Sequence, residues 1–153
     1  MILKTQNNQE TQAFGKKFAK KLKGGEILAL VGELGAGKTV FVKGIAKELG
    51  IKGTITSPTF VLLRQYSVPL ILRSSDTLSL IHLDLYRLKN NEIDSLGLSD
   101  YLGKKEYICV IEWAEKIKNK LKRFGNKVVW IKFEYIDENM RKINIKFQSS
   151  NVK

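Results

Sequence analysis

Eight residues in the first third of the chain have the types and spacing that hold phosphate groups. Residues 32–39 read Gly-Glu-Leu-Gly-Ala-Gly-Lys-Thr, which matches the pattern G-x-x-x-x-G-K-[ST]. The three glycines let the backbone turn tightly and point successive N–H groups at a phosphate. Lys38 supplies a compact cation for the β- and γ-phosphates, and Thr39 offers a hydroxyl to the Mg²⁺ that accompanies a nucleotide. The segment therefore predicts a nucleotide site.

The residues on either side of this loop predict the elements that must position it. Residues 27–31, Ile-Leu-Ala-Leu-Val, form a short apolar run that is typical of a buried strand in a parallel sheet. Residues 38–49 carry apolar side chains at helical spacing and are followed by Gly50, a helix stop signal. The order strand, loop, helix is the context that the pattern requires, and the helix N-terminus adds positive charge to the site.

A phosphate loop also needs a carboxylate that holds Mg²⁺ and a polar group that orients the attacking water. Asp84 and Glu112 each follow an apolar run, 80–83 and 107–111, as expected at the carboxyl ends of buried strands. The alternative for either acid is to cap a helix or to pair with Arg87. His82 is expected to be a packed or hydrogen-bonded core residue and not a general base.

The remaining pattern predicts an α/β domain of three layers with a mixed, mostly parallel sheet and a C-terminal β-hairpin. The whole chain, residues 1–153, is expected to form one domain. A helix is predicted at 9–22, one or two short helical turns at 91–102 and a basic amphipathic segment at 114–123. Strands are predicted at 60–66, 78–85 and 107–111, and the hairpin at 128–136 and 143–147.

Composition limits the classes of function. No apolar run is long enough to span a membrane, no signal region precedes the first helix, and Cys109 has no partner for a disulfide, so we expect a cytoplasmic protein. The formal net charge is +12, and 22 of the 27 basic residues are lysines spread along the chain. Two explanations remain open: an RNA-related surface, or an A/T-rich coding bias that also enriches Ile and Asn.

Four ordered motifs together resemble the TsaE (YjeE) family, the small bacterial ATPases of tRNA threonylcarbamoyladenosine synthesis. They are residues 32–39, Ser-Pro-Thr-Phe at 57–60, His-Leu-Asp-Leu-Tyr-Arg-Leu at 82–88, and Ile-Glu-Trp at 111–113. The resemblance runs from about Thr11 to Arg141. It implies a P-loop NTPase fold, ATP and Mg²⁺ as cofactors, and action on the TsaD and TsaB subunits, which modify adenosine 37 of tRNAs that read ANN codons. Contact with tRNA would be indirect, through that complex, and no membrane is involved.

The resemblance also assigns roles. Lys38, Asp84 and Glu112 would be the catalytic residues, and Thr39, Glu112 and Asp84 the metal site. The segment 57–59 would be a mobile switch that senses the γ-phosphate. The nucleotide would be bound by Gly32, Gly35, Ala36, Gly37, Lys38, Thr39, Val40, Thr11, Thr59, Trp113 and Arg141.

Two departures from the family pattern and two alternative functions remain. The family often has a second threonine where this chain has Val40, and the segment 67–78 is longer than expected and predicted to form an extended hairpin.

A small nucleotide or metabolite kinase is the first alternative function, although the five arginines are too scattered for an acceptor-binding lid. A non-enzymatic RNA-binding module is the second, although neither an aromatic stacking platform nor an RNA-reading motif is evident.

Overall fold

The computed structural model describes residues 1–56, 63–69 and 77–150. The predicted switch segment 57–59, with the nucleotide contact Thr59, lies outside these residues. So does residue range 70–76 of the predicted long hairpin, and so does the first half of the strand predicted at 60–66.

One seven-stranded sheet organises the chain, in the order β1-β7-β6-β2-β5-β4-β3. The four central strands, β6, β2, β5 and β4, run parallel to one another, whereas β1, β7 and β3 pair antiparallel at the two edges. The strands are β1 (Ile2–Thr5), β2 (Ile27–Val31), β3 (Leu63–Val68), β4 (Leu78–Asp84), β5 (Tyr107–Glu112), β6 (Val128–Tyr135) and β7 (Arg141–Phe147). The mixed sheet and the C-terminal hairpin β6–β7 confirm the predicted fold class.

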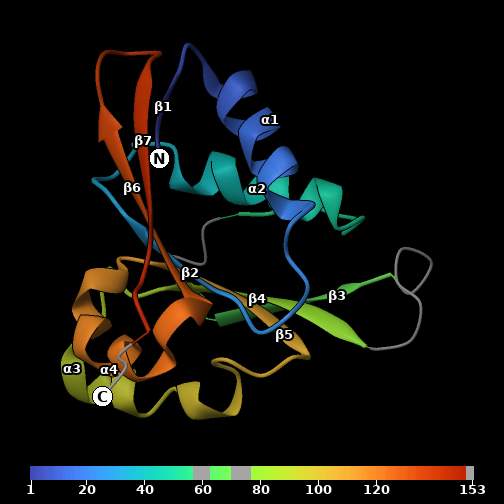
Figure 1. Ribbon diagram of the computed structural model, residues 1–153, viewed down its shortest axis with the longest axis vertical. Helices are drawn as coiled ribbons and strands as arrows, with labels where there is room; N and C mark the ends of the chain where they lie inside the picture. Colours follow the sequence, from blue (N-terminus) through green and yellow to red (C-terminus); the bar gives the residue numbers. More distant parts are fainter. Residues whose placement is uncertain (57–62, 70–76, 151–153) are drawn as a thin grey trace.

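Helices cover both faces of this sheet, which gives the three predicted layers (Figure 1). α1 (Asn8–Ala19) and α2 (Lys38–Glu48) pack on one face. The other face is covered by α3 (Asn90–Asp94), η2 (Leu98–Asp100), η3 (Ala114–Ile117), α4 (Lys118–Leu121) and η4 (Lys122–Lys127). The central strands are apolar at consecutive positions because alternate side chains enter two cores, one on each face.

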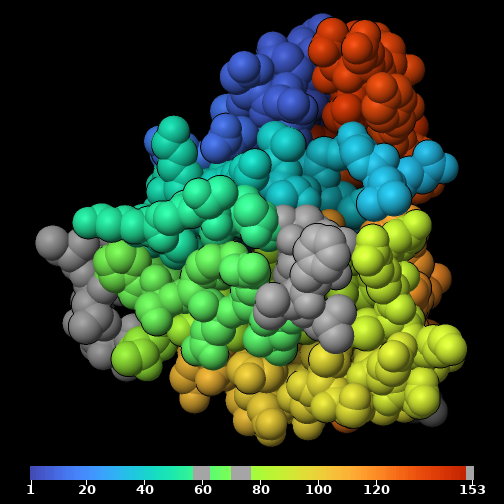
Figure 2. All heavy atoms as spheres, turned by 180° about the vertical axis from the view of Figure 1, so that it is seen from behind, coloured from blue at the N-terminus to red at the C-terminus, as the bar shows by residue number. Residues whose placement is uncertain are grey.

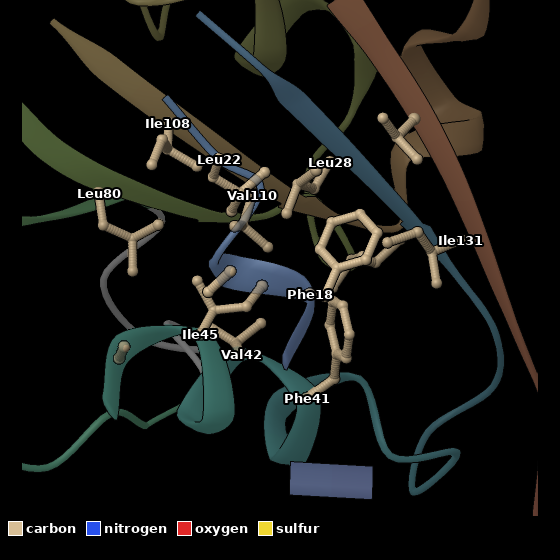
Figure 3. Packing of buried hydrophobic residues seen from close by; sticks show 14 of the residues in the cluster. Phe18, Leu22, Leu28, Phe41, Val42, Ile45, Leu80, Ile108, Val110 and Ile131 are labelled. Carbon is tan, nitrogen blue, oxygen red and sulfur yellow. The ribbon is translucent and has the colours of Figure 1, made fainter. Parts of the chain in front are cut away.

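The core between the sheet and α1 and α2 is built around aromatic rings (Figure 3). Phe18 of α1 and Phe41 of α2 point toward one another, with their ring centroids 5.7 Å apart. Phe133 of β6 meets Phe41 edge-on at 5.5 Å. Such pairs hold α2, and with it the end of the glycine loop, against α1 and β6.

Two terminal features differ from the sequence prediction. The helix predicted over 9–22 ends at Ala19, and the chain then turns before Gly24 and Gly25. Residues 2–5 form an edge strand that the sequence analysis did not predict. The strand is too short to show a period, and its pairing with β7 decides its conformation. Figure 2 shows the result, with the N-terminal segment lying against the C-terminal hairpin.

No helix among the described residues is long and apolar enough to cross a membrane.

Candidate functional site

The glycine loop lies between the end of β2 and the start of α2, as the pattern requires. Gly37 precedes the helix with a left-handed backbone at φ 100°, and Gly35 has φ 77°. Gly32 has φ 150°, and a Cβ atom there would lie 2.6 Å from the carbonyl oxygen of Phe133. The loop can therefore approach β6 this closely only with glycine at position 32.

Lys38 is folded back onto the loop. Its Nζ donates hydrogen bonds to the carbonyl oxygens of Gly32 and, at 2.8 Å, of Glu33. The ammonium also lies 4.9 Å from the centre of the Trp113 ring. Burial lowers the pKa of the Lys38 ammonium, and the carboxylates around it, Glu112 first, oppose that effect. The lysine is thus held at the mouth of the loop by uncharged carbonyl acceptors that an anion could replace.

A hydrogen-bond chain links the loop to the end of β5. Thr39 Oγ1 donates to Glu112 Oε1 at 3.2 Å, and the same oxygen lies 2.9 Å from Nε2 of His82. Since a carboxylate only accepts, Nε2 carries the proton of that imidazole. His82 is fully buried and Glu112 is nearly so. The side-chain partners observed for Glu112 are thus Thr39 and His82, and not the helix cap or the Arg87 pair that the sequence left as alternatives.

Asp84 lies beside Glu112 because β4 and β5 are parallel and in register at this point. The two residues are paired across the strands, so both carboxylates reach the same edge of the sheet. Asp84 Oδ1 accepts a hydrogen bond from the backbone N–H of Tyr86 at 2.9 Å, and the side chain is largely buried. The structure therefore brings together the loop and both of the predicted acids.

Two aromatic residues line the same edge. The rings of Tyr86 and Trp113 are 4.8 Å apart, and Trp113 has a left-handed backbone at φ 60°. That conformation is costly for a bulky residue and is found most often at functional sites. It turns the chain sharply after Glu112 and places the indole beside Lys38.

Thr11 and Arg141 also lie close to the loop, beside Gly37. A Cβ at Gly37 would lie 3.7 Å from side-chain atoms of each of them. Arg141 Nη2 donates to the carbonyl oxygen of Gly35 at 3.1 Å, while its Nη1 donates to carbonyls of the β6–β7 turn. The Nε of this buried guanidinium has no hydrogen-bond partner among the described residues.

Three further residues were predicted to contact the nucleotide: Ala36, Val40 and Thr59. Ala36 is buried in the loop, and its backbone N–H donates to the carbonyl oxygen of Glu33 at 3.1 Å. Val40 is half-buried on the first turn of α2, one position beyond Thr39. Thr59 lies outside the described residues.

The residues present fit Mg²⁺ bound with a nucleotide. No group of three or more His, Cys, Asp or Glu side chains that could hold a metal occurs in the described part of the chain. Mg²⁺ in nucleotide sites needs fewer protein ligands, since it takes one or two carboxylates together with phosphate oxygens and water. Thr39, Glu112 and Asp84 would supply the oxygen ligands that such a site requires.

His82 lies closer to the candidate site than the sequence analysis predicted. The prediction that it is hydrogen-bonded is confirmed, but its partner is the Glu112 carboxylate itself. The signal was available: a strand that alternates Leu80, His82 and Asp84 on one face places the imidazole two residues before the acid.

The sheet order, the strand–loop–helix unit and the acids at the ends of β4 and β5 define a P-loop NTPase fold. A family model described as "Threonylcarbamoyl adenosine biosynthesis protein TsaE" matches residues 5–143. The chain belongs to the TsaE family, which takes part in the biosynthesis of threonylcarbamoyladenosine in tRNA.

Individual relatives agree over most of their length. The tRNA threonylcarbamoyladenosine biosynthesis protein TsaE of Bacillus subtilis (strain 168) is 40% identical over 118 residues, 77% of this chain and 69% of the relative. The protein of the same name from Aquifex aeolicus (strain VF5) is 35% identical over 142 residues, 92% of this chain and 91% of the relative. Among solved structures, the crystal structure of Bacillus subtilus YdiB superposes with a TM-score of 0.74 at 30% identity, covering 97% of this chain and 86% of that chain.

Proposed function

We propose that this chain binds ATP with Mg²⁺ at residues 32–39 and hydrolyses it slowly in the service of tRNA threonylcarbamoyladenosine synthesis. The observation that carries the proposal is the hydrogen bond from Thr39 to Glu112. It joins the hydroxyl of the loop to a carboxylate on the neighbouring strand, which is the pair of ligands that a P-loop protein offers to Mg²⁺.

Each residue has a defined task in the proposed reaction. The loop N–H groups and Lys38 bind the phosphates, and Lys38 exchanges the carbonyls of Gly32 and Glu33 for phosphate oxygens. Thr39 and Glu112 would hold the metal, which when bound would neutralise charge on the phosphates. Asp84 would orient water toward the γ-phosphate, either directly or by helping to hold the metal. Stabilisation of developing charge is the largest contribution to such a reaction.

In the described part of the chain, Arg141 is the arginine whose hydrogen bonds tie it to the glycine loop. Arg141 reaches the loop, but its Nη groups are bonded to backbone carbonyls. We therefore propose that the isolated chain is a weak ATPase and that the TsaD and TsaB subunits complete its site. An arginine supplied by a partner typically raises phosphoryl-transfer rates by about 10³–10⁵.

Two measurements on the purified chain test this proposal. ATP hydrolysis is measured with and without TsaD and TsaB, and tRNA modification is reconstituted with the same proteins. Lys38→Ala should abolish hydrolysis and multiple rounds of modification, whereas Lys43→Ala, an exposed lysine of the same helix, should behave as wild type. The proposal is wrong if Lys38→Ala sustains multiple turnovers as well as wild type, or if the isolated chain hydrolyses ATP as fast as the assembled complex.

A further inference from the structure

A groove of about 550 Å³ lies on the face of β6 and β7 that points away from α1 and α2. On β6, Ile131 and Phe133 enter the core under those helices, so Trp130 and Lys132 alternate onto the opposite face. The segment of η3, α4 and η4 forms the other wall, beside the end of β7 (Figure 1). None of residues 32–39 lines this groove, but Val31, which directly precedes the loop, does, so the groove adjoins the glycine loop without including it.

The groove concentrates positive charge. Four lysines line it against one glutamate, Glu115, whereas the whole chain has 27 basic and 15 acidic residues. Among the described residues, Lys132 pairs with Glu134 at 3.1 Å and the other three lysines form no ion pair. We call this feature the lysine groove, defined by Lys118, Lys122, Lys132 and Lys146.

An aromatic ring lies among these lysines, and its position is fixed. The indole Nε1 of Trp130 donates to Gln148 Oε1 at 3.1 Å, and Gln148 Nε2 donates to the carbonyls of Leu121 and Lys122 at 3.1 and 3.3 Å. Gln148 therefore ties the ring to the helical wall. Trp130 remains only half-buried and keeps surface open to the groove.

Lysines around a fixed aromatic ring are the combination with which proteins hold single-stranded nucleic acid, since the cations follow the phosphates and a base stacks on the ring. The volume of the groove is in the range of a small-ligand site, so it admits one or two nucleotides of a strand and excludes a duplex. An acidic protein surface would satisfy the lysines but would leave the aromatic ring without a planar partner.

We propose that the lysine groove binds single-stranded RNA directly, with Lys118, Lys122, Lys132 and Lys146 on the phosphates and Trp130 stacked on a base. This goes beyond the proposed function, in which tRNA is reached only through the TsaD and TsaB subunits. It also gives part of the +12 charge a location and supplies the stacking residue that was not evident from the sequence.

Fluorescence anisotropy of a labelled oligouridylate with the full chain tests the role of the lysines. Each phosphate contact to a single strand contributes a salt slope of about 0.7, which corresponds to about fivefold in affinity at about 0.1 M salt. The double variant Lys118→Gln/Lys122→Gln should therefore bind about 25-fold more weakly and lower the slope by about 1.4. Lys17→Gln/Lys21→Gln removes the same charge from exposed positions on and just beyond α1 and should weaken binding less than about threefold.

The fluorescence of Trp130 tests the stacking. In a Trp113→Phe background Trp130 is the only tryptophan, and the oligouridylate should quench it, whereas heparin, a polyanion without bases, should not. Equal loss of affinity in both lysine pairs would show that only the net charge attracts RNA. Unchanged RNA affinity in Lys118→Gln/Lys122→Gln, with loss of binding to the TsaD and TsaB subunits, would assign the groove to an acidic protein. Either result overturns the proposal and leaves the ATPase proposal unaffected.

Discussion

Replacing Glu112 by glutamine should separate metal binding from folding, because one oxygen of this residue has two structural partners. Glu112 Oε1 accepts from Thr39 and from the buried imidazole of His82. A glutamine amide oxygen can accept the same two hydrogen bonds, but it carries no charge. Glu112→Ala removes the acceptor altogether.

The two variants should therefore differ in their free energies of unfolding. In Glu112→Ala the fully buried Nε2–H of His82 loses its acceptor, at a cost of about 1–3 kcal/mol, and the lost side-chain volume adds to this. We expect a total of about 2–5 kcal/mol. Glu112→Gln should cost about 1 kcal/mol, since weaker neutral hydrogen bonds are offset by relief from burying a charge.

In both variants the gain in nucleotide affinity that Mg²⁺ provides should fall at least about ten- to hundredfold. Removal of a group that only supports a metal ligand already costs that much. Urea unfolding gives the stabilities, and titration of a fluorescent ADP with and without Mg²⁺ gives the metal dependence. Glu106→Gln, an exposed acid at the opposite end of β5, is the control and should change neither. Full Mg²⁺ dependence in Glu112→Gln would refute Glu112 as a ligand, and equal stability of the two variants would refute its role in holding His82.

Three further outcomes follow from the structure. Gly32→Ala places a Cβ 2.6 Å from the carbonyl oxygen of Phe133 and should destabilise the chain by more than about 2 kcal/mol. Gly35→Ala meets no atom within 4 Å, so it should cost only about 1–2 kcal/mol, the cost of a left-handed backbone for alanine. Urea unfolding of the two variants measures both free energies. Burial raises the pKa of the Cys109 thiol from 9.0 to about 12, so as pH rises the thiol ionises in the unfolded chain before it ionises in the folded chain. The free energy of unfolding should therefore fall as pH rises from 9 toward 12. At about pH 10 this loss is about 1.4 kcal/mol, and it should be absent from Cys109→Ala in paired denaturation curves at about pH 7 and 10. Arg141→Lys gives up the fork that reaches Gly35 and the hairpin turn, and should speed hydrogen exchange of the loop amides while costing about 2–3 kcal/mol.

The parts of the fold that the sequence predicted are those in which local pattern and tertiary structure agree. Residues 27–31 are apolar at every position because both faces of β2 are covered, and this signal identified the strand correctly. Residues 2–5 have no such pattern. Their strand exists because β7 offers an unpaired edge, which is a property of a segment almost 140 residues away along the chain.

The candidate site divides in the same way. The glycine loop is local, and its residues could be read from their spacing alone. Asp84 and Glu112 could be inferred because the ends of parallel strands meet at one edge, which is a rule of topology. The meeting of Thr39 and His82 at one oxygen of Glu112 depends on the register of β4 and β5, and no short-range pattern carries that register.

The register also explains how this fold holds Glu112, the proposed metal ligand, in place. β4 and β5 are paired from Ser79 with Tyr107 to Asp84 with Glu112, so the carboxylate of Glu112 cannot shift along the strand without breaking the whole ladder. His82 fixes its side chain from the neighbouring strand, and Thr39 fixes it from the loop. Anchoring from two elements keeps a ligand close to its bound position, which lowers the ordering entropy lost when the ligand site forms. His82→Ala should therefore weaken Mg²⁺-dependent nucleotide binding through the Glu112 carboxylate, to which the fully buried imidazole is hydrogen-bonded. Unchanged Mg²⁺ dependence in that variant would show that the strand register alone is sufficient.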